Sequence, residues 1–151
     1  MNWTYVHLAT NHIPVLGSLF GLALTLFAIR KKSDDILKFT LGFWVFLAIA
    51  SIVVYLTGEP AEEVVEHLVG TSEPALEAHE DAAIFGFVFM EIIGAMALAA
   101  LLFRQKIAGK LDLILKTMLI LATINSGVMI RIADLGGAIR HPEIHGNQDP
   151  K

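Results

Sequence analysis

The sequence predicts an all-α, membrane-embedded, up-and-down four-helix bundle with both termini on the outer side. More than half of the 151 residues are apolar (55%), and the mean hydropathy is +0.64. Four long apolar runs are almost free of charge, and a membrane-spanning helix needs about 20 such residues. Lysine and arginine gather at alternate connections between these runs. The chain has no cysteine, which excludes disulfides, thiolate zinc sites and iron–sulfur clusters of its own.

The first two spans are predicted at residues 5–29 and 36–58. Residues 1–29 and 39–58 carry no charged side chain. The basic residues follow the first run, whereas a secretory signal peptide carries them in front. Ser33 is the predicted N-cap of the second span, because serine oxygens accept hydrogen bonds from free helix N–H groups.

The third and fourth spans are predicted at residues 75–104 and 111–136. Thr71 or Ser72 is the predicted N-cap of the third span. The pair Gly136–Gly137 predicts the end of the fourth. We expect one domain over residues 1–144 and a disordered tail over residues 145–151.

The basic connections determine the expected orientation. No lysine or arginine occurs between residues 39 and 103, so the positive-inside rule places the connections at residues 30–38 and 104–116 in the cytoplasm. Both termini and the acidic 59–81 segment then lie outside. We expect a multi-pass membrane protein with both termini outside the cytoplasm; the resemblance described below implies that the membrane is a bacterial cytoplasmic (inner) membrane and the termini are periplasmic. The acids form a solvated face or gather cations, and residues 59–70 are expected to form a short interfacial helix.

All six histidines fall on the expected outer half of the bundle: His7, His12, His67, His79, His141 and His145. Scattered surface histidines would be shared more evenly between the two sides. The first pair is five residues apart, which is about 140° around a helix. His7 and His12 therefore face one site only if Pro14 breaks the helix. Gly17 and Gly21 are a small-residue pair typical of helix packing.

His79 begins a stripe of small residues on the third span, formed with Ala83, Gly86 and Met90. Such a stripe leaves a slot for a flat macrocycle or for a closely packed neighbouring helix. Glu91 is the one acid deep inside a span, so it needs a proton or a partner. A proton relay, a ligand role and a hydrogen bond to Asn125 all remain open for it.

Two arginines near the outer end could hold acidic groups. Arg131 either pairs with Asp134 three residues on, or meets an acid from elsewhere, such as Glu91 or a cofactor propionate. Arg140 interrupts the acidic outer pattern and is the second candidate for a propionate.

We therefore expect a b-type haem or redox-metal protein that transfers electrons near the outer face. Imidazoles from two helices would be the axial ligands of haem b. His12 and His79 are the first choice, with His7 and His141 as alternates. Copper, zinc or iron bound directly is the other cofactor hypothesis. An electron-transfer component fits better than a stand-alone enzyme, because common hydrolase, nucleotide and zincin motifs are missing.

The expected partners are the lipid bilayer, quinol, an outer-side electron carrier, subunits of a respiratory complex or a second copy of the chain. No basic face indicates nucleic acid. The alternative hypothesis is a non-catalytic scaffold subunit of a larger respiratory or transport complex, in which the histidines only donate hydrogen bonds.

Three motifs in order carry a resemblance to a known family. The run HLATNHIP opens the first span as H-x4-H-x-P, His79 opens a later span, and LGGAIRH follows the last. The chain resembles small bacterial four-helix membrane proteins of domain of unknown function family 2231. The resemblance implies a four-helix membrane fold. It also implies haem or redox-metal binding through these histidines.

Overall fold

The chain is all-helical over residues 2–141, which the computed structural model describes. Five α-helices and one short 3-10 helix follow one another there, without a strand. Their bounds are α1 Trp3–Thr10, α2 His12–Lys31, α3 Asp34–Glu66, α4 Glu73–Leu102, η1 Ala108–Lys110 and α5 Leu111–Arg140. The predicted tail at residues 145–151 lies outside the described residues.

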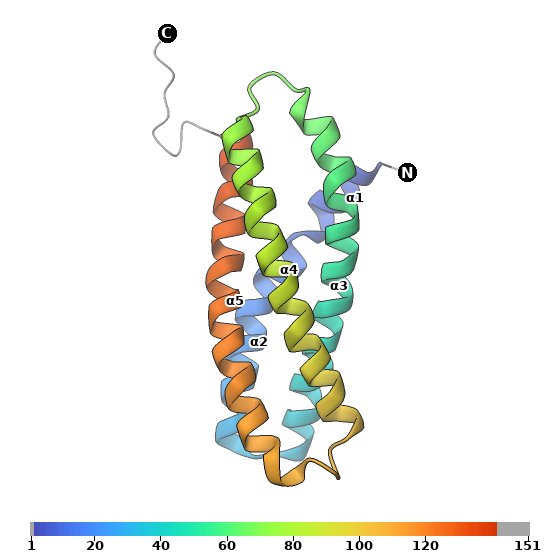
Figure 1. Cartoon of the computed structure of the whole chain (residues 1–151), viewed down its shortest axis with the longest axis vertical. Helices are drawn as coiled ribbons and strands as arrows, with labels where there is room; N and C mark the ends of the chain where they lie inside the picture. The colour runs from blue at the N-terminus through green and yellow to red at the C-terminus, as the bar shows by residue number, and fades with distance from the viewer. Residues whose placement is uncertain (1, 142–151) are drawn as a thin grey trace.

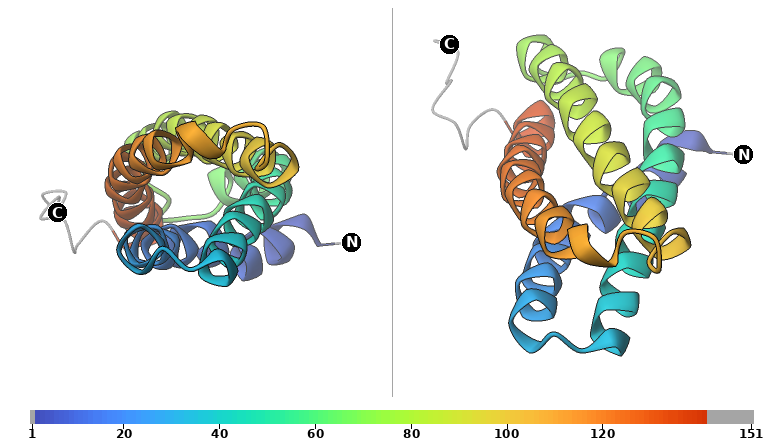
Figure 2. Two further views of the ribbon diagram at one scale, coloured as in Figure 1. Left: turned by 90° about the horizontal axis from the view of Figure 1, so that it is seen from below. Right: turned by 60° about the horizontal axis from the view of Figure 1, so that its bottom comes forward.

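The four long helices form a closed ring in which each packs against its neighbours in the chain. Contacts join α2 to α3, α3 to α4 and α4 to α5, and α5 closes the ring on α2 (Figure 1; Figure 2, left). Short connections make consecutive helices antiparallel. The predicted all-α fold is confirmed, and its arrangement is compatible with an up-and-down bundle.

Four helical segments are long and apolar enough to cross a membrane. They are Trp3–Lys31, Asp34–Glu66, Glu73–Leu102 and Ala108–Arg140, and each holds an 18-residue window with a mean hydropathy of at least 1.8. Many large apolar side chains on their outer surfaces are exposed. This exposure is compatible with a lipid environment, because such surfaces carry no penalty in hydrocarbon.

The first span is not the single helix that the sequence predicts. The helix is interrupted at Asn11, a turn residue whose own backbone dihedrals stay helical, and α1 departs from the line of α2 to lie against α3 (Figure 1). Pro14 falls in the first turn of α2, where its missing N–H group costs no hydrogen bond. The polar pair Asn11–His12 thus begins a new helix.

Two predicted helix ends are also wrong. α3 runs through Pro60 to Glu66, so residues 59–66 extend it and form no separate interfacial helix. Packing against α1 supports this outer extension. α5 passes through Gly136–Gly137 to Arg140, because Ala138 and Ile139 are buried. By contrast, Ser72 occupies the predicted N-cap position of α4.

Small residues of α2 bring it close to α3. A Cβ on Gly21 would stand 2.7 Å from the indole ring of Trp44, and Gly17 packs in the same way on Leu47. The fully buried Trp44 donates its indole N–H to Thr25 Oγ1 at 2.9 Å. The prediction that Gly17 and Gly21 serve helix packing is therefore confirmed.

Candidate functional site

The His7 imidazole joins α1 to the outer half of α3. Its Nδ1 atom lies 3.1 Å from the carbonyl oxygen of Val54 and 3.4 Å from Thr57 Oγ1. Gly58 lies directly beneath the ring, and a Cβ there would be 3.7 Å from Cε1 of His7. The break at Asn11 creates this arrangement, because it lets α1 turn onto α3.

The His79 imidazole joins α4 to α5 in the same manner. Its Nδ1 atom lies 3.0 Å from the carbonyl oxygen of Ile132. Gly136 lies beneath the ring, and a Cβ there would be only 3.2 Å from Cε1 and 3.3 Å from Nδ1. These distances are shorter than ordinary contacts, so the half-buried ring occupies space that only glycine leaves.

One local geometry therefore occurs twice, on two different pairs of helices. In each case the imidazole covers a glycine and bonds the carbonyl four residues before that glycine: Val54 before Gly58, and Ile132 before Gly136. A carbonyl oxygen can only accept, so each Nδ1 carries the proton and donates it. In the neutral ring this leaves a lone pair on each Nε2, the nitrogen suited to a metal.

The helices that carry the two imidazoles, α1 and α4, do not pack directly against each other within residues 2–141. Both rings are half-buried at the end of the bundle that also carries the α3–α4 loop. A positive charge on His7 would oppose a positive charge on His79. Each ring keeps an Nε2 lone pair, and the two rings come from separate helices of one chain.

His12, the first sequence choice, lies elsewhere. It is exposed at the start of α2, and its Nδ1 atom is 2.5 Å from Asn11 Oδ1. The sequence predicts that His12 points into the bundle, because it would lie deeper than His7 in a continuous first helix. The interruption at Asn11 places His12 at the start of α2 instead. His7 therefore takes the place beside His79 that the sequence analysis gave to His12.

Two further described histidines follow the ends of helices. His67 follows α3, His141 follows α5, and both are exposed. His145 lies outside the described residues. Within residues 2–141, no three side chains of histidine, aspartate or glutamate come together as a metal-binding group.

Both arginines proposed for propionates have protein partners. Arg131 Nη1 lies 2.7 Å from Asp134 Oδ2, which confirms the predicted i,i+3 pair on an exposed face. Arg140 Nη1 donates to the Val69 carbonyl at 3.2 Å and to Thr71 Oγ1 at 3.3 Å. Arg140 therefore ties the α3–α4 loop to the end of α5, the helix that carries Gly136.

Glu91 lies between α3 and α4, where it accepts a hydrogen bond from Ser51 Oγ at 2.7 Å. This bond answers the open question of its partner, because Asn125 instead directs its amide Nδ2 toward Met90 Sδ at 4.0 Å. The Oδ1 atom of Asn125 and the hydroxyl of Ser126 are buried without a hydrogen-bond partner among the described residues. Neither contacts the histidine pair through a bond that the structure shows.

The stripe below His79 is filled by protein. A Cβ on Gly86 would stand 2.6 Å from Ile132 Cδ1 and 3.0 Å from Met129 Cε, both on α5. The stripe thus serves helix packing at Gly86 and leaves no slot for a flat macrocycle at that residue.

Gly58 and Gly136 are not among the predicted site residues. Gly58 is predicted to end an apolar run, and Gly136 to end the fourth helix. The available signal was a glycine inside a helix that other residues continue, which usually has a packing or functional reason.

Comparisons with protein-family models, with curated proteins and with solved structures found no match. The resemblance to family 2231 therefore stays a prediction.

Proposed function

We propose that this protein is an integral membrane b-type haem protein that transfers electrons near the outer face of a bacterial cytoplasmic membrane. His7 and His79 are the proposed axial ligands, each through Nε2. The observation that carries the proposal is the repeated imidazole–carbonyl geometry, with Nδ1 3.1 Å from Val54 O in one half and 3.0 Å from Ile132 O in the other.

The chain's own groups would prepare the ligands in three ways. The Val54 and Ile132 carbonyls fix the tautomer and make each imidazole more basic, as hydrogen-bonded partners of metal-bound histidines do. Gly136 leaves room for the His79 ring beside the backbone of α5. His7 on α1 and His79 on α4 would hold the cofactor from separate helices. When bound, haem would supply a one-electron iron couple.

The charge pattern supports a direction for the electrons. Under the positive-inside rule, the histidine end of the bundle lies outside. Glu59, Glu62, Glu66 and Glu80 cluster at that end and repel one another. An acidic outer rim favours a basic electron carrier there, because complementary charge raises association rates. A quinol within the bilayer is the proposed electron donor.

The decisive experiment compares histidine variants that keep or lose the carbonyl hydrogen bond. In asparagine, Nδ2 can replace histidine Nδ1 as a donor, but nothing replaces Nε2. We expect the purified full chain to show a low-spin haem spectrum, oxidised and reduced. We expect His7→Asn and His79→Asn to lose that spectrum while remaining folded. His12→Asn and His67→Asn are the matched controls, and both should keep it.

A scaffold subunit is the competing proposal, because a purely structural histidine would make the same Nδ1 bonds. It predicts that His7→Asn and His79→Asn preserve stability and the assembly of any larger complex. A wild-type protein without a Soret band and without stoichiometric iron would sink the haem proposal. Stoichiometric copper or zinc instead would favour a directly bound metal.

A further inference from the structure

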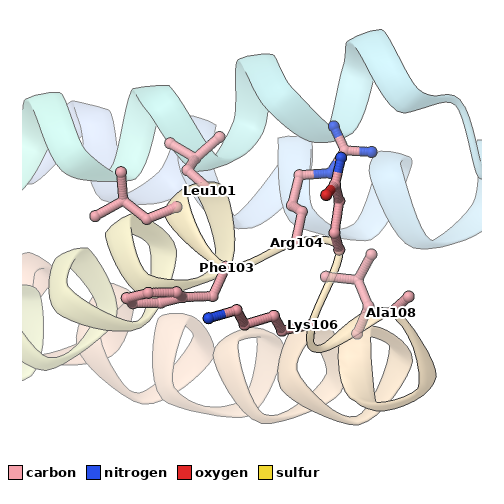
Figure 3. A pocket seen from close by; sticks show the side chains of 8 residues that line it. Leu101, Phe103, Arg104, Lys106 and Ala108 are labelled. Carbon is pink, nitrogen blue, oxygen red and sulfur yellow. The ribbon is translucent and has the colours of Figure 1, made fainter.

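A shallow depression lies at the turn between α4 and α5, at the opposite end of the bundle from the histidines (Figure 3). Its lining comes from the last turn of α4, the connection and the start of α5. The lining residues are Leu101, Leu102, Phe103, Arg104, Gln105, Lys106, Ala108 and Leu111.

The lining combines apolar walls with hydrogen-bond donors. Leu102 is 68% exposed and Phe103 is 50% exposed, so both present apolar surface beside the depression. The polar side chains are Arg104, Gln105 and Lys106, which all carry N–H groups, and no carboxylate lines the depression. Such a surface suits a ligand with an anionic head and an apolar body.

The ion pairs near the depression leave both Lys106, which lines it, and the neighbouring Lys110 without an acidic partner within residues 2–141. Arg104 pairs with Asp34, and Asp34 also receives Lys38 Nζ at 2.7 Å. Lys116 pairs with Asp112 at 2.6 Å. Lys106 makes no ion pair within residues 2–141. The guanidinium of Arg104 has five N–H donors, so one carboxylate does not exhaust it.

We propose that this depression binds the phosphodiester headgroup of an anionic phospholipid. Lys106, Arg104 and the Gln105 amide contact the phosphate, and the acyl chains follow the exposed surface of Leu102 and Phe103. The inference uses the membrane placement proposed above, in which this turn faces the anionic cytoplasmic leaflet, and it is independent of the histidine pair. Clusters of lysine and arginine beside a membrane span are typical of such lipid recognition.

The test is native mass spectrometry of the full chain released from detergent micelles with added phosphatidylglycerol or phosphatidylcholine. We expect retention of phosphatidylglycerol in preference to phosphatidylcholine. Lys106→Gln should weaken retention about fivefold, as expected for one lost cation near a lipid phosphate. Lys106→Arg should restore it. Lys116→Gln is the matched control, because Lys116 lies outside the depression and has its own acid.

Equal retention of the two lipids would overturn the proposal. The same conclusion follows if Lys106→Gln and Lys116→Gln behave alike. Inorganic phosphate added at the concentration of the lipid should not displace phosphatidylglycerol, and full displacement would indicate a free-anion site instead. Since Lys106 is exposed, its variants should unfold at the wild-type temperature. A protein without haem would leave each of these expectations unchanged.

Discussion

Gly136 leaves the space that the imidazole of His79 occupies. A Cβ at residue 136 would stand 3.2 Å from Cε1 of His79, closer than ordinary van der Waals contact. The same ring donates to the Ile132 carbonyl one helical turn below. The His79 ring can therefore reach the Ile132 carbonyl only because residue 136 has no side chain.

The first prediction follows from the next residue along the chain. Gly137 has no neighbouring atom within 4 Å of a Cβ built on it, so it makes a matched control. Gly137→Ala should stabilise α5 by up to about 1 kcal/mol, the helix-propensity difference between glycine and alanine. Gly136→Ala should lose that gain and displace His79, with reduced haem content. Thermal unfolding and the visible spectrum measure the two effects.

The second prediction concerns Gly58, which occupies the corresponding place under His7. A Cβ there would be 3.7 Å from Cε1, an ordinary contact. Gly58→Ala should therefore retain the haem spectrum and stability, unlike Gly136→Ala. Equal damage from the two substitutions would contradict this ordering of the two half-sites.

The third prediction tests the hydrogen bond between α3 and α2 that joins Trp44 to Thr25. Thr25→Val removes the acceptor of the Trp44 indole N–H, and both residues are fully buried. Leaving that donor unsatisfied should cost about 1–3 kcal/mol of unfolding free energy. Thr123→Val is the control, because the exposed Thr123 bonds only the Leu119 carbonyl of its own helix. Denaturant unfolding in detergent should separate the two variants, and equal stabilities would count against a structural role for the indole bond.

The sequence predicts the four long helices because charge-free length is a local property. The Arg131–Asp134 pair could also be predicted, since both residues lie on one helix. The break at Asn11 could not be located in this way. Asparagine tolerates several conformations and proline is accepted in the first turn of a helix, so whether the helix continues depends on what α1 packs against.

The choice between His7 and His12 could not be predicted from the sequence either. The spacing of His7 and His12 along a helix shows that the two side chains point in different directions. It does not show which of them is half-buried near the end of the bundle that carries His79. That choice depends on α1 turning onto α3 and on Gly58 and Gly136, which lie far along the chain. A glycine that terminates a helix and a glycine that admits a neighbouring ring look alike in one sequence.

The fourth prediction concerns Glu91, which accepts the hydroxyl of Ser51 at 2.7 Å. Glu91→Gln keeps an oxygen acceptor at the same place, so stability should change little. Glu91→Leu removes it and should cost about 1 kcal/mol through the lost hydrogen bond. If Glu91 also passes protons during electron transfer, Glu91→Gln should slow quinol-driven reduction while stability and haem content stay unchanged. Stopped-flow reduction of the purified protein by a quinol gives the rate.

The fifth prediction tests which end of the bundle faces outward. The chain has no cysteine, so a single introduced cysteine reports its own location without background. Val69 is 98% exposed in the α3–α4 loop, and Lys106 is exposed in the α4–α5 turn. A membrane-impermeant maleimide should label Val69→Cys in intact cells, whereas Lys106→Cys should react only after the membrane is permeabilised. The positive-inside rule requires this order, because the turn that contains Lys106 carries the basic residues. Labelling in the reverse order would place the histidine end of the bundle in the cytoplasm and would exclude an outer-side electron carrier as its partner.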